Sequence, residues 1–184
     1  MWGILARLRG AVAAQMNGVT MTDAVDELIA YRKQFGKLGP TLRRLYRFHK
    51  ANPQVLDFLV SEMRVERANG WAHTSLGSLW HYSRWVLARV GRSPGETFLM
   101  PNNLFPAYGR IIAILHPDLN GFFGMARCKA DADLGTGLEP LPKNAARGYV
   151  RHLRWADGTP LGLGWRPTTP HDPKPVSRRE RVRR

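Results

Sequence analysis

Apolar residues recur at three- and four-residue intervals through most of the first 115 residues, with polar residues between them. This spacing places apolar side chains along one face of a helix. Glycine, proline and asparagine separate one periodic run from the next, as expected at helix ends. The pattern predicts helices over 20–35, 41–50, 53–69, 74–90 and 104–115.

The clearest part of this pattern is the pair of helices at 53–69 and 74–90. Asn52-Pro53 is typical of a helix start, and Asn69-Gly70 of a helix end. Two helices joined by a short turn that contains glycine are the arrangement of a helix-turn-helix. We therefore expect a mainly α fold with a core of this kind. The short stretch 97–103 that follows is a candidate wing, and a plain helical hairpin is the alternative.

Charge divides the chain differently from hydropathy. The 184 residues include 28 Lys+Arg and 14 Asp+Glu, a formal net charge of +14. Residues 1–142 hold 17 basic and 11 acidic side chains, whereas 143–184 hold 11 and 3. Seven of the 13 prolines lie between Pro140 and Pro175. We expect an N-terminal amphipathic segment over 1–19, a helical body over 20–142 and a basic extension over 143–184, with a short hairpin at 148–166.

A strongly basic chain attracts polyanions, of which nucleic acid is the first candidate. The single cysteine excludes an internal disulfide framework and a cysteine-based structural zinc site. The six histidines form no pair with the spacing of metal ligands on one helix. We therefore expect a non-enzymatic protein without a cofactor or a bound metal, and without a membrane-spanning segment.

Two groups of residues within the body are candidate nucleic-acid contacts. A recognition helix needs polar residues near its N-terminus to reach base edges. The expected reading face of the helix 74–90 consists of Thr74, Ser75, Ser78, His81 and Arg84. A cluster of basic side chains on the helix 41–50 is expected to hold phosphates. This cluster consists of Arg43, Arg44, Arg47 and Lys50.

The basic extension supplies the remaining candidates. In the expected hairpin, arginines alternate with the aromatic residues Tyr149, Trp155 and Trp165, a pattern that suits base stacking. The basic residues proposed to bind nucleic acid here are Arg151, Arg154, Arg178, Arg179, Arg181, Arg183 and Arg184. The last five form a terminal electrostatic arm, which is expected to add affinity that depends on salt.

Two other functions remain open beside binding to duplex DNA. Binding of RNA through 148–184 is the first. The second is capture of a host or virion protein through residues 2–12, where Trp2, Ile4, Leu5 and Leu8 form an apolar stripe. The sequence favours duplex DNA over RNA because of the helix pair, and it leaves the oligomeric state open.

Several short motifs between residues 48 and 127 occur in a recognisable order. They are Phe48-His49 followed by Asn52-Pro53, then Asn102-Asn103, then Pro106, Tyr108 and Arg110, and last His116 to Phe123. In this order they resemble a family of small uncharacterised proteins encoded by phages and prophages. The resemblance implies a phage accessory protein in the cytoplasm of a bacterial host, and it brings no catalytic residues. Family members usually continue Asn-Asn with polar residues, whereas Leu104 and Phe105 follow here.

Overall fold

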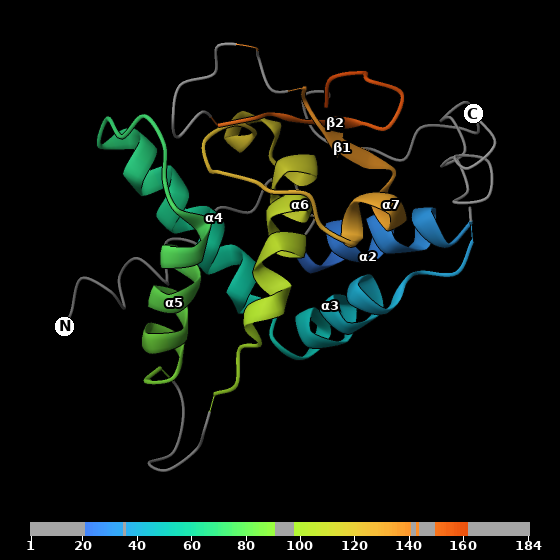
Figure 1. Cartoon of the computed structure of the whole chain (residues 1–184). Coiled ribbons are helices and arrows are strands. Elements are labelled where there is room, and N and C mark those ends of the chain that lie inside the picture. The colour runs from blue at the N-terminus through green and yellow to red at the C-terminus, as the bar shows by residue number, and fades with distance from the viewer. Residues whose placement is uncertain (1–20, 35, 91–97, 141–142, 144–149, 162–184) are drawn as a thin grey trace.

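The computed structural model describes residues 21–34, 36–90, 98–140, 143 and 150–161, and these form a mainly α structure (Figure 1). The α-helices are α2 (Met21–Lys33), α3 (Pro40–Ala51), α4 (Gln54–Ala68), α5 (Leu76–Leu87), α6 (Phe105–Leu115) and α7 (Ala130–Leu134). Two 3₁₀ turns lie at η1 (Asn102–Leu104) and η2 (Pro117–Leu119), and two strands at β1 (Thr136–Leu138) and β2 (Leu153–Trp155). The expectation of a mainly α fold is confirmed. No described helix has both the length and the apolar character needed to cross a bilayer.

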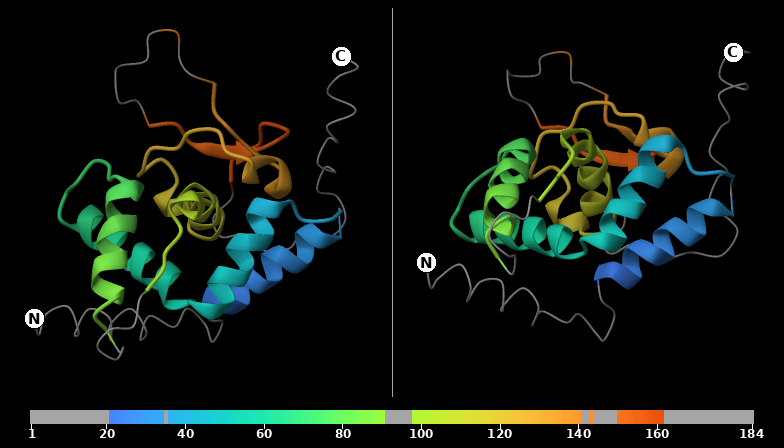
Figure 2. Two further views of the ribbon diagram at one scale, coloured as in Figure 1. Left: turned by 60° about the horizontal axis from the view of Figure 1, so that its bottom comes forward. Right: turned by 90° about the horizontal axis from the view of Figure 1, so that it is seen from below.

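Helix α6 is the centre of the fold. It contacts α3, α4, α5 and α7, and one view in Figure 2 looks along its axis with the other helices around it. Its residues are apolar on nearly every side, as expected for a helix surrounded by others. Tyr108, Ile111 and Ile112 are all fully buried. The helices predicted from periodicity therefore assemble around the most apolar of them.

Aromatic rings fill the space between α3, α5 and α6. Trp80 is fully buried, and its ring centroid lies 5.2 Å from that of Tyr108. Phe48 and Phe105 complete the cluster at centroid distances of 6.4 and 6.5 Å from Trp80. Such offset and tilted contacts are the favoured geometry for aromatic pairs. The cluster joins α5 to the centre of the fold.

The helix pair at 53–69 and 74–90 forms, as α4 and α5, with Val55, Leu59 and Met63 fully buried. The candidate wing at 97–103 is described only from residue 98 onward. Within its described part, residues 98–100 pair with no strand, and 102–104 form the 3₁₀ turn η1. Residues 91–97 lie outside the described part of the chain. The described residues between α5 and α6 therefore contain no strand.

The side chain of Asn52 differs from its expected role as a cap of α4. Its amide nitrogen donates to the Phe48 carbonyl at 3.0 Å, and its backbone N–H donates to the carbonyl of His49. Asn52 therefore closes α3 rather than opening α4. The next helix begins at Gln54 without a side-chain cap, and the missing N–H of Pro53, just before it, has no consequence.

The predicted hairpin at 148–166 is only partly correct. The turn forms, since Gly158 has a φ of 91° and the Asp157 carboxylate accepts hydrogen bonds from Thr159. However, the antiparallel partner of β2 is β1, and a single bridge joins Arg154 to Pro160. Pairing with β1 lets Leu153 reach the core, where it is 1% exposed. Residues 162–166 lie outside the described residues.

This pairing also corrects the expected domain boundary. Residues 150–161 fall in the predicted basic extension, yet β2 belongs to the sheet of the body and Leu153 to its core. The body therefore includes this segment. The N-terminal segment 1–19 and the terminal arm over 178–184 both lie outside the described residues.

Candidate nucleic-acid interface

A basic groove lies between α2 and α3, which run side by side in both views of Figure 2. Its volume is about 1000 Å³, and it opens to solvent. We call it the α2–α3 groove. It is lined by Lys33, Gly36, Lys37, Leu38, Pro40, Arg43, Tyr46 and Arg47. Four of these eight residues are basic and none is acidic.

The position of the basic side chains follows from the amphipathic pattern of α3. Leu42 and Leu45 are buried against the core, which turns Arg43 and Arg47 outward on the opposite face. Residues four apart lie one above the other on a helix, so these two guanidinium groups line the same wall. Lys33 ends α2, and Lys37 lies on the connection between the helices. The groove thus collects cations from three consecutive parts of the chain.

The N-terminus of α3 is not available to a ligand, because a carboxylate already occupies it. The backbone N–H of Gly39 donates to Asp133 of α7. A Cβ atom at Gly39 would meet that carboxylate at less than 3 Å, so a larger residue there would displace Asp133. Burial raises the pKa of Asp133, and Gly39 and Arg43 oppose that rise. Recognition of an anion in the groove therefore depends on side chains.

Tyr46 gives the groove an aromatic side. The ring is half-buried and packs against the core, with the ammonium groups of Lys33 and Lys50 at 5.3 and 5.4 Å from its centroid. Cations at such distances are attracted to the face of the ring. Tyr46 is thereby held in place by the core and has two lysine ammonium groups close to its ring.

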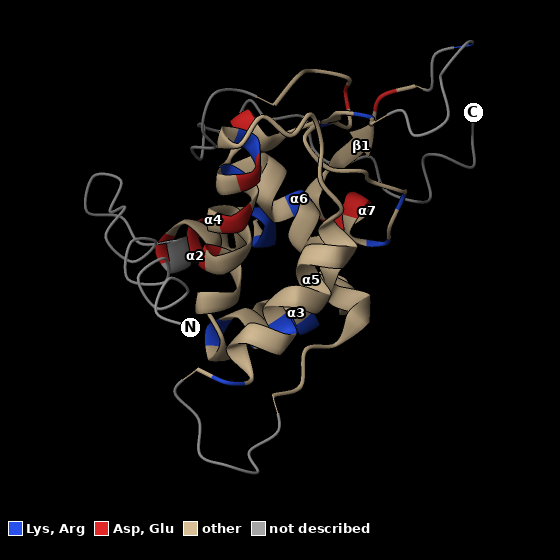
Figure 3. Cartoon of the chain, turned by 90° about the vertical axis from the view of Figure 1, so that its left-hand side faces the viewer, with Lys and Arg blue, Asp and Glu red and all other residues tan. Residues whose placement is uncertain are grey.

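The four basic residues predicted on α3 lie in three different surroundings. Arg43 and Arg47 line the groove, whereas the exposed Arg44 does not. Lys50 pairs with Asp26 of α2 at 3.7 Å, and this carboxylate is the main cause of its raised pKa. Figure 3 shows that α3 carries basic residues alone, whereas acidic and basic residues alternate along α4. Only two of the four expected phosphate contacts therefore lie in the groove.

Lys33 and Lys37 also line the α2–α3 groove, although the sequence pattern does not single them out. Both are exposed, and neither makes an ion pair within the described part of the chain. They are four residues apart at the end of the first predicted helix, and this spacing is a sequence signal for basic side chains on one face. Gly36, Gly39 and Pro40 obscure it, because these residues indicate a helix end rather than the wall of a groove.

The expected reading face of α5 is partly unavailable. Ser78 and His81 are exposed, and the Ser75 side chain accepts the Ser78 N–H at 3.2 Å as the helix cap. Thr74 is buried instead, and its backbone N–H donates to the carbonyl of Phe122 at 2.8 Å. The Arg84 guanidinium donates to the Met100 carbonyl at 2.8 Å and to the Asn102 side chain. Thr74 and Arg84 therefore hold the fold together, contrary to the expectation that they face nucleic acid.

The outer face of α5 is aromatic rather than polar. Tyr82 and Trp85 stack with their centroids 6.4 Å apart, and Trp85 is 52% exposed. The Arg89 guanidinium lies 4.1 Å from the centre of the Trp85 ring and donates to the Trp85 carbonyl. We call these three residues the α5 ridge. The ridge is therefore mainly aromatic, and its one cation, Arg89, already interacts with the ring of Trp85.

The residues of the expected hairpin are largely engaged within the protein. Arg154 forms an ion pair with Glu139 at 3.4 Å, and Trp155 packs against the core. Arg151 is half-exposed. The five arginines of the terminal arm are not described. The described part of the hairpin therefore offers no exposed aromatic residue for stacking.

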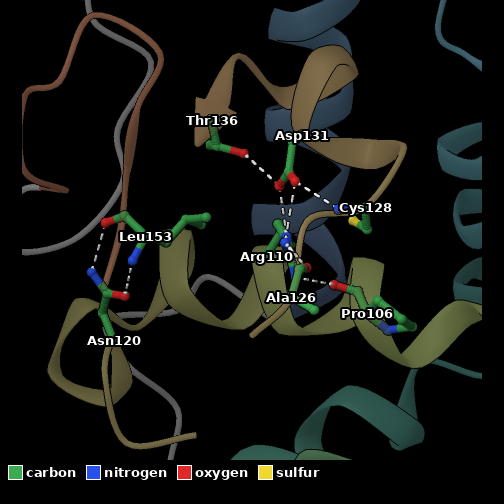
Figure 4. Close-up of polar contacts among 8 residues, drawn as sticks. All are labelled: Pro106, Arg110, Asn120, Ala126, Cys128, Asp131, Thr136 and Leu153. Carbon is green, nitrogen blue, oxygen red and sulfur yellow. Dashed lines mark hydrogen bonds and ion pairs between the residues drawn. The ribbon is translucent and has the colours of Figure 1, made fainter. Parts of the chain in front are cut away.

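A second charged cluster, buried beside α6, contrasts with the groove (Figure 4). The Arg110 guanidinium donates to both carboxylate oxygens of Asp131, at 2.7 and 3.2 Å, and to the carbonyls of Pro106 and Ala126. Asp131 in turn accepts the backbone N–H of Cys128. Burial raises the pKa of the Cys128 thiol. With Arg110 only 1% exposed, this cluster fastens the 126–136 segment to α6 and is closed to ligands.

Asn120 has a comparable structural role at the other end of α6. Its side-chain amide donates to the Leu153 carbonyl at 2.9 Å and its oxygen accepts the Leu153 N–H at 2.8 Å, as Figure 4 shows. The motifs at 106–110 and 116–123 thus supply residues that build the fold. His116, in the same stretch, is buried and accepts a hydrogen bond from Arg64, and burial lowers its pKa to about 4.

Comparisons with family models, with curated proteins and with solved structures each gave no match. The described residues contain no group of three or more His, Cys, Asp or Glu side chains that could hold a metal ion. The interpretation of the site therefore depends on the groove and its charges.

Proposed function

We propose that this protein is a non-enzymatic nucleic-acid-binding protein whose α2–α3 groove neutralises backbone phosphates. The observation that carries the proposal is the groove itself, with four basic side chains and no acidic one among the lining residues that the structure describes. Long basic side chains neutralise the phosphates of a nucleic acid. Each neutralised phosphate releases condensed counterions, and this release favours binding.

The distribution of charge over the whole chain supports the same partner. The net charge of +14 exceeds what the groove contributes, and the segment 143–184 alone holds 11 basic residues against 3 acidic ones. Such a segment adds sequence-independent affinity to a site on the body. We place this activity in a phage or prophage accessory protein in the cytoplasm of its bacterial host.

Base reading by α5 has less support than phosphate binding by the groove. Two of its five expected contacts, Thr74 and Arg84, are engaged within the protein, and the outer face of α5 is aromatic. The expectation of duplex DNA depends on base reading by the same helix pair, so its support is reduced as well. We therefore propose binding that depends on phosphates, with no requirement for a particular base sequence.

The test is a salt titration of the affinity of the full chain for a labelled oligonucleotide. We expect log affinity to fall linearly with log salt. The variant Arg43→Gln/Arg47→Gln should lower that slope by about 0.7 to 0.9 for each phosphate that it no longer neutralises. The matched control Arg44→Gln/Arg89→Gln removes the same charge from outside the groove and should change the slope less. Absence of binding to DNA and RNA at low salt would refute the proposal.

A protein partner is the second candidate function, and the α5 ridge is the observation that favours it. Aromatic residues are enriched in protein interfaces, and Tyr82 and Trp85 of the ridge are 36% and 52% exposed. The apolar stripe at 2–12 lies outside the described residues. A pull-down with and without nuclease separates the two functions, because a nucleic-acid bridge is lost on digestion and a direct protein partner is retained.

A further inference from the structure

We propose that the α2–α3 groove binds a single strand of nucleic acid, with its phosphates on the basic side chains and a base against Tyr46. This inference rests on the proposed function and makes it more specific. It concerns the form of the nucleic acid, which the charge of the chain does not determine.

The mixed lining of the groove is the first reason. Beside its four basic residues, the groove is lined by the apolar side chains Leu38 and Pro40 and by the ring of Tyr46. A duplex presents phosphates and sugars on its outside and keeps its bases stacked within, so apolar lining gains little from a duplex backbone. A single strand exposes base faces, and sites for single strands combine a basic groove with aromatic side chains.

The concave shape of the groove is the second reason. Proteins that read a duplex commonly insert a projecting helix or ribbon into its major groove. Here the basic side chains instead line a hollow of about 1000 Å³, near the upper end of the usual range for sites that enclose small molecules. A hollow of this size has room for a few nucleotides of one strand. A duplex would meet only its rim.

The setting of Tyr46 is the third reason. Its ring packs on the core and lies on the same helix as Arg43 and Arg47, so a base on the ring brings the adjoining phosphates close to both guanidinium groups. The Lys33 and Lys50 ammonium groups lie 5.3 and 5.4 Å from the ring centroid, both on exposed side chains. Lys33 is able to leave the ring for a phosphate when a base arrives, while Lys50 keeps its ion pair with Asp26. An anchored ring loses little conformational freedom on binding.

The test compares the full chain with two fluorescent probes at low salt, a deoxythymidine strand of about 15 nucleotides and a duplex of the same length. We expect at least about tenfold tighter binding to the strand. The variant Tyr46→Leu keeps an apolar side chain toward the core and removes the ring face, so binding to the strand should weaken about five- to tenfold. Tyr46→Phe keeps the ring and should restore it. Binding to the duplex should change little in either variant.

The outcomes separate this inference from the proposed function. Equal or tighter binding to the duplex would overturn the single-strand inference and leave phosphate binding by the groove intact. A preference for the strand that survives Tyr46→Leu would overturn the assignment of a base to Tyr46. Failure of both probes to bind at low salt would refute the inference and the proposed function together. Thermal unfolding of each variant should match that of the parent chain, which shows that the loss is one of binding.

Discussion

Arg110 and Arg43 are the same type of residue in opposite surroundings. Arg110 is 1% exposed and hydrogen-bonds to Asp131 and to two backbone carbonyls, whereas Arg43 is exposed on the wall of the α2–α3 groove and forms no ion pair within the described part of the chain. A buried charge must be compensated, because desolvation without a partner is costly. Arg110 is therefore tied to the fold, while Arg43 is available to an external anion. The contrast separates a charge that stabilises the fold from a charge that remains open to a ligand.

A similar division exists within α3. Lys50 and Arg47 are three residues apart and both exposed, but within the described residues only Lys50 pairs with a carboxylate, that of Asp26 at 3.7 Å. The sequence pattern alone groups them in one basic cluster. The packing of α2 against α3 removes Lys50 from that cluster and adds Lys33 and Lys37. The set of basic residues that lines the groove therefore depends on the packing of two helices as well as on the composition of α3.

Removal of the buried arginine should have the largest effect on stability. In Arg110→Ala, Asp131 remains largely buried without its partner, and breaking such a pair costs about 3–5 kcal/mol of the free energy of unfolding. Denaturant unfolding measures the loss. The exposed Arg127→Ala, seventeen residues further along the chain, should cost less than about 0.5 kcal/mol. A loss below about 1 kcal/mol in Arg110→Ala would contradict the structural role of this cluster.

Acidification should produce the next largest effect, through His116. Burial, and then Arg64, lower its pKa from 6.5 to about 4 in the folded chain, so the unfolded chain binds the proton more readily. Its contribution is fully present above about pH 6.5 and is lost as the pH falls toward 4, by up to about 3 kcal/mol. Burial lowers the pKa of His49 as well, which acts in the same direction.

Denaturant unfolding at several pH values between 7 and 4 measures this dependence. His116→Gln should flatten the curve over that range, and His81→Gln, at an exposed position, should serve as the control. A curve that is equally steep in the parent chain and in His116→Gln would show that His116 is not the source.

The contacts of Asn120 with β2 should have a smaller effect. Asn120→Ala removes two hydrogen bonds to the Leu153 backbone, with an expected loss of about 1–3 kcal/mol. Hydrogen exchange at the Leu153 amide should become faster. Asn120→Asp keeps the acceptor for that amide and loses the donor, so it should lie between the parent chain and the alanine variant. Unchanged exchange in Asn120→Ala would contradict the pairing.

The smallest effect on stability is expected in the groove. Arg43→Gln/Arg47→Gln removes two exposed side chains that make no ion pair in the described residues, so the free energy of unfolding should change by less than about 0.5 kcal/mol. Differential scanning calorimetry of the parent and the variant measures it. A loss similar to that of Arg110→Ala would mean that the groove arginines support the fold, which would remove the contrast.

The sequence predicts the helices α2 to α6, because three- and four-residue periodicity is a local signal, but it does not predict the five-residue helix α7. The pairing of β1 with β2 has no such local signal. β1 and β2 have three residues each and lie 15 or more residues apart, and β2 is held by Asn120 from a third segment. The site is predictable only in part for the same reason. The spacing of Arg43 and Arg47 is visible along one helix, whereas the engagement of Arg84 by Met100 depends on an interaction across the fold.

The central claim is that unpaired charges of the α2–α3 groove hold nucleic acid. The most direct measurement is the ratio of two dissociation constants for one labelled oligonucleotide at one low salt concentration. One belongs to Arg43→Gln/Arg47→Gln and the other to Arg44→Gln/Arg89→Gln, which carry the same net charge. We expect the groove variant to bind at least about tenfold more weakly, a difference of about 1.4 kcal/mol. Equal dissociation constants would show that binding responds to total charge alone and would contradict the assignment of the groove.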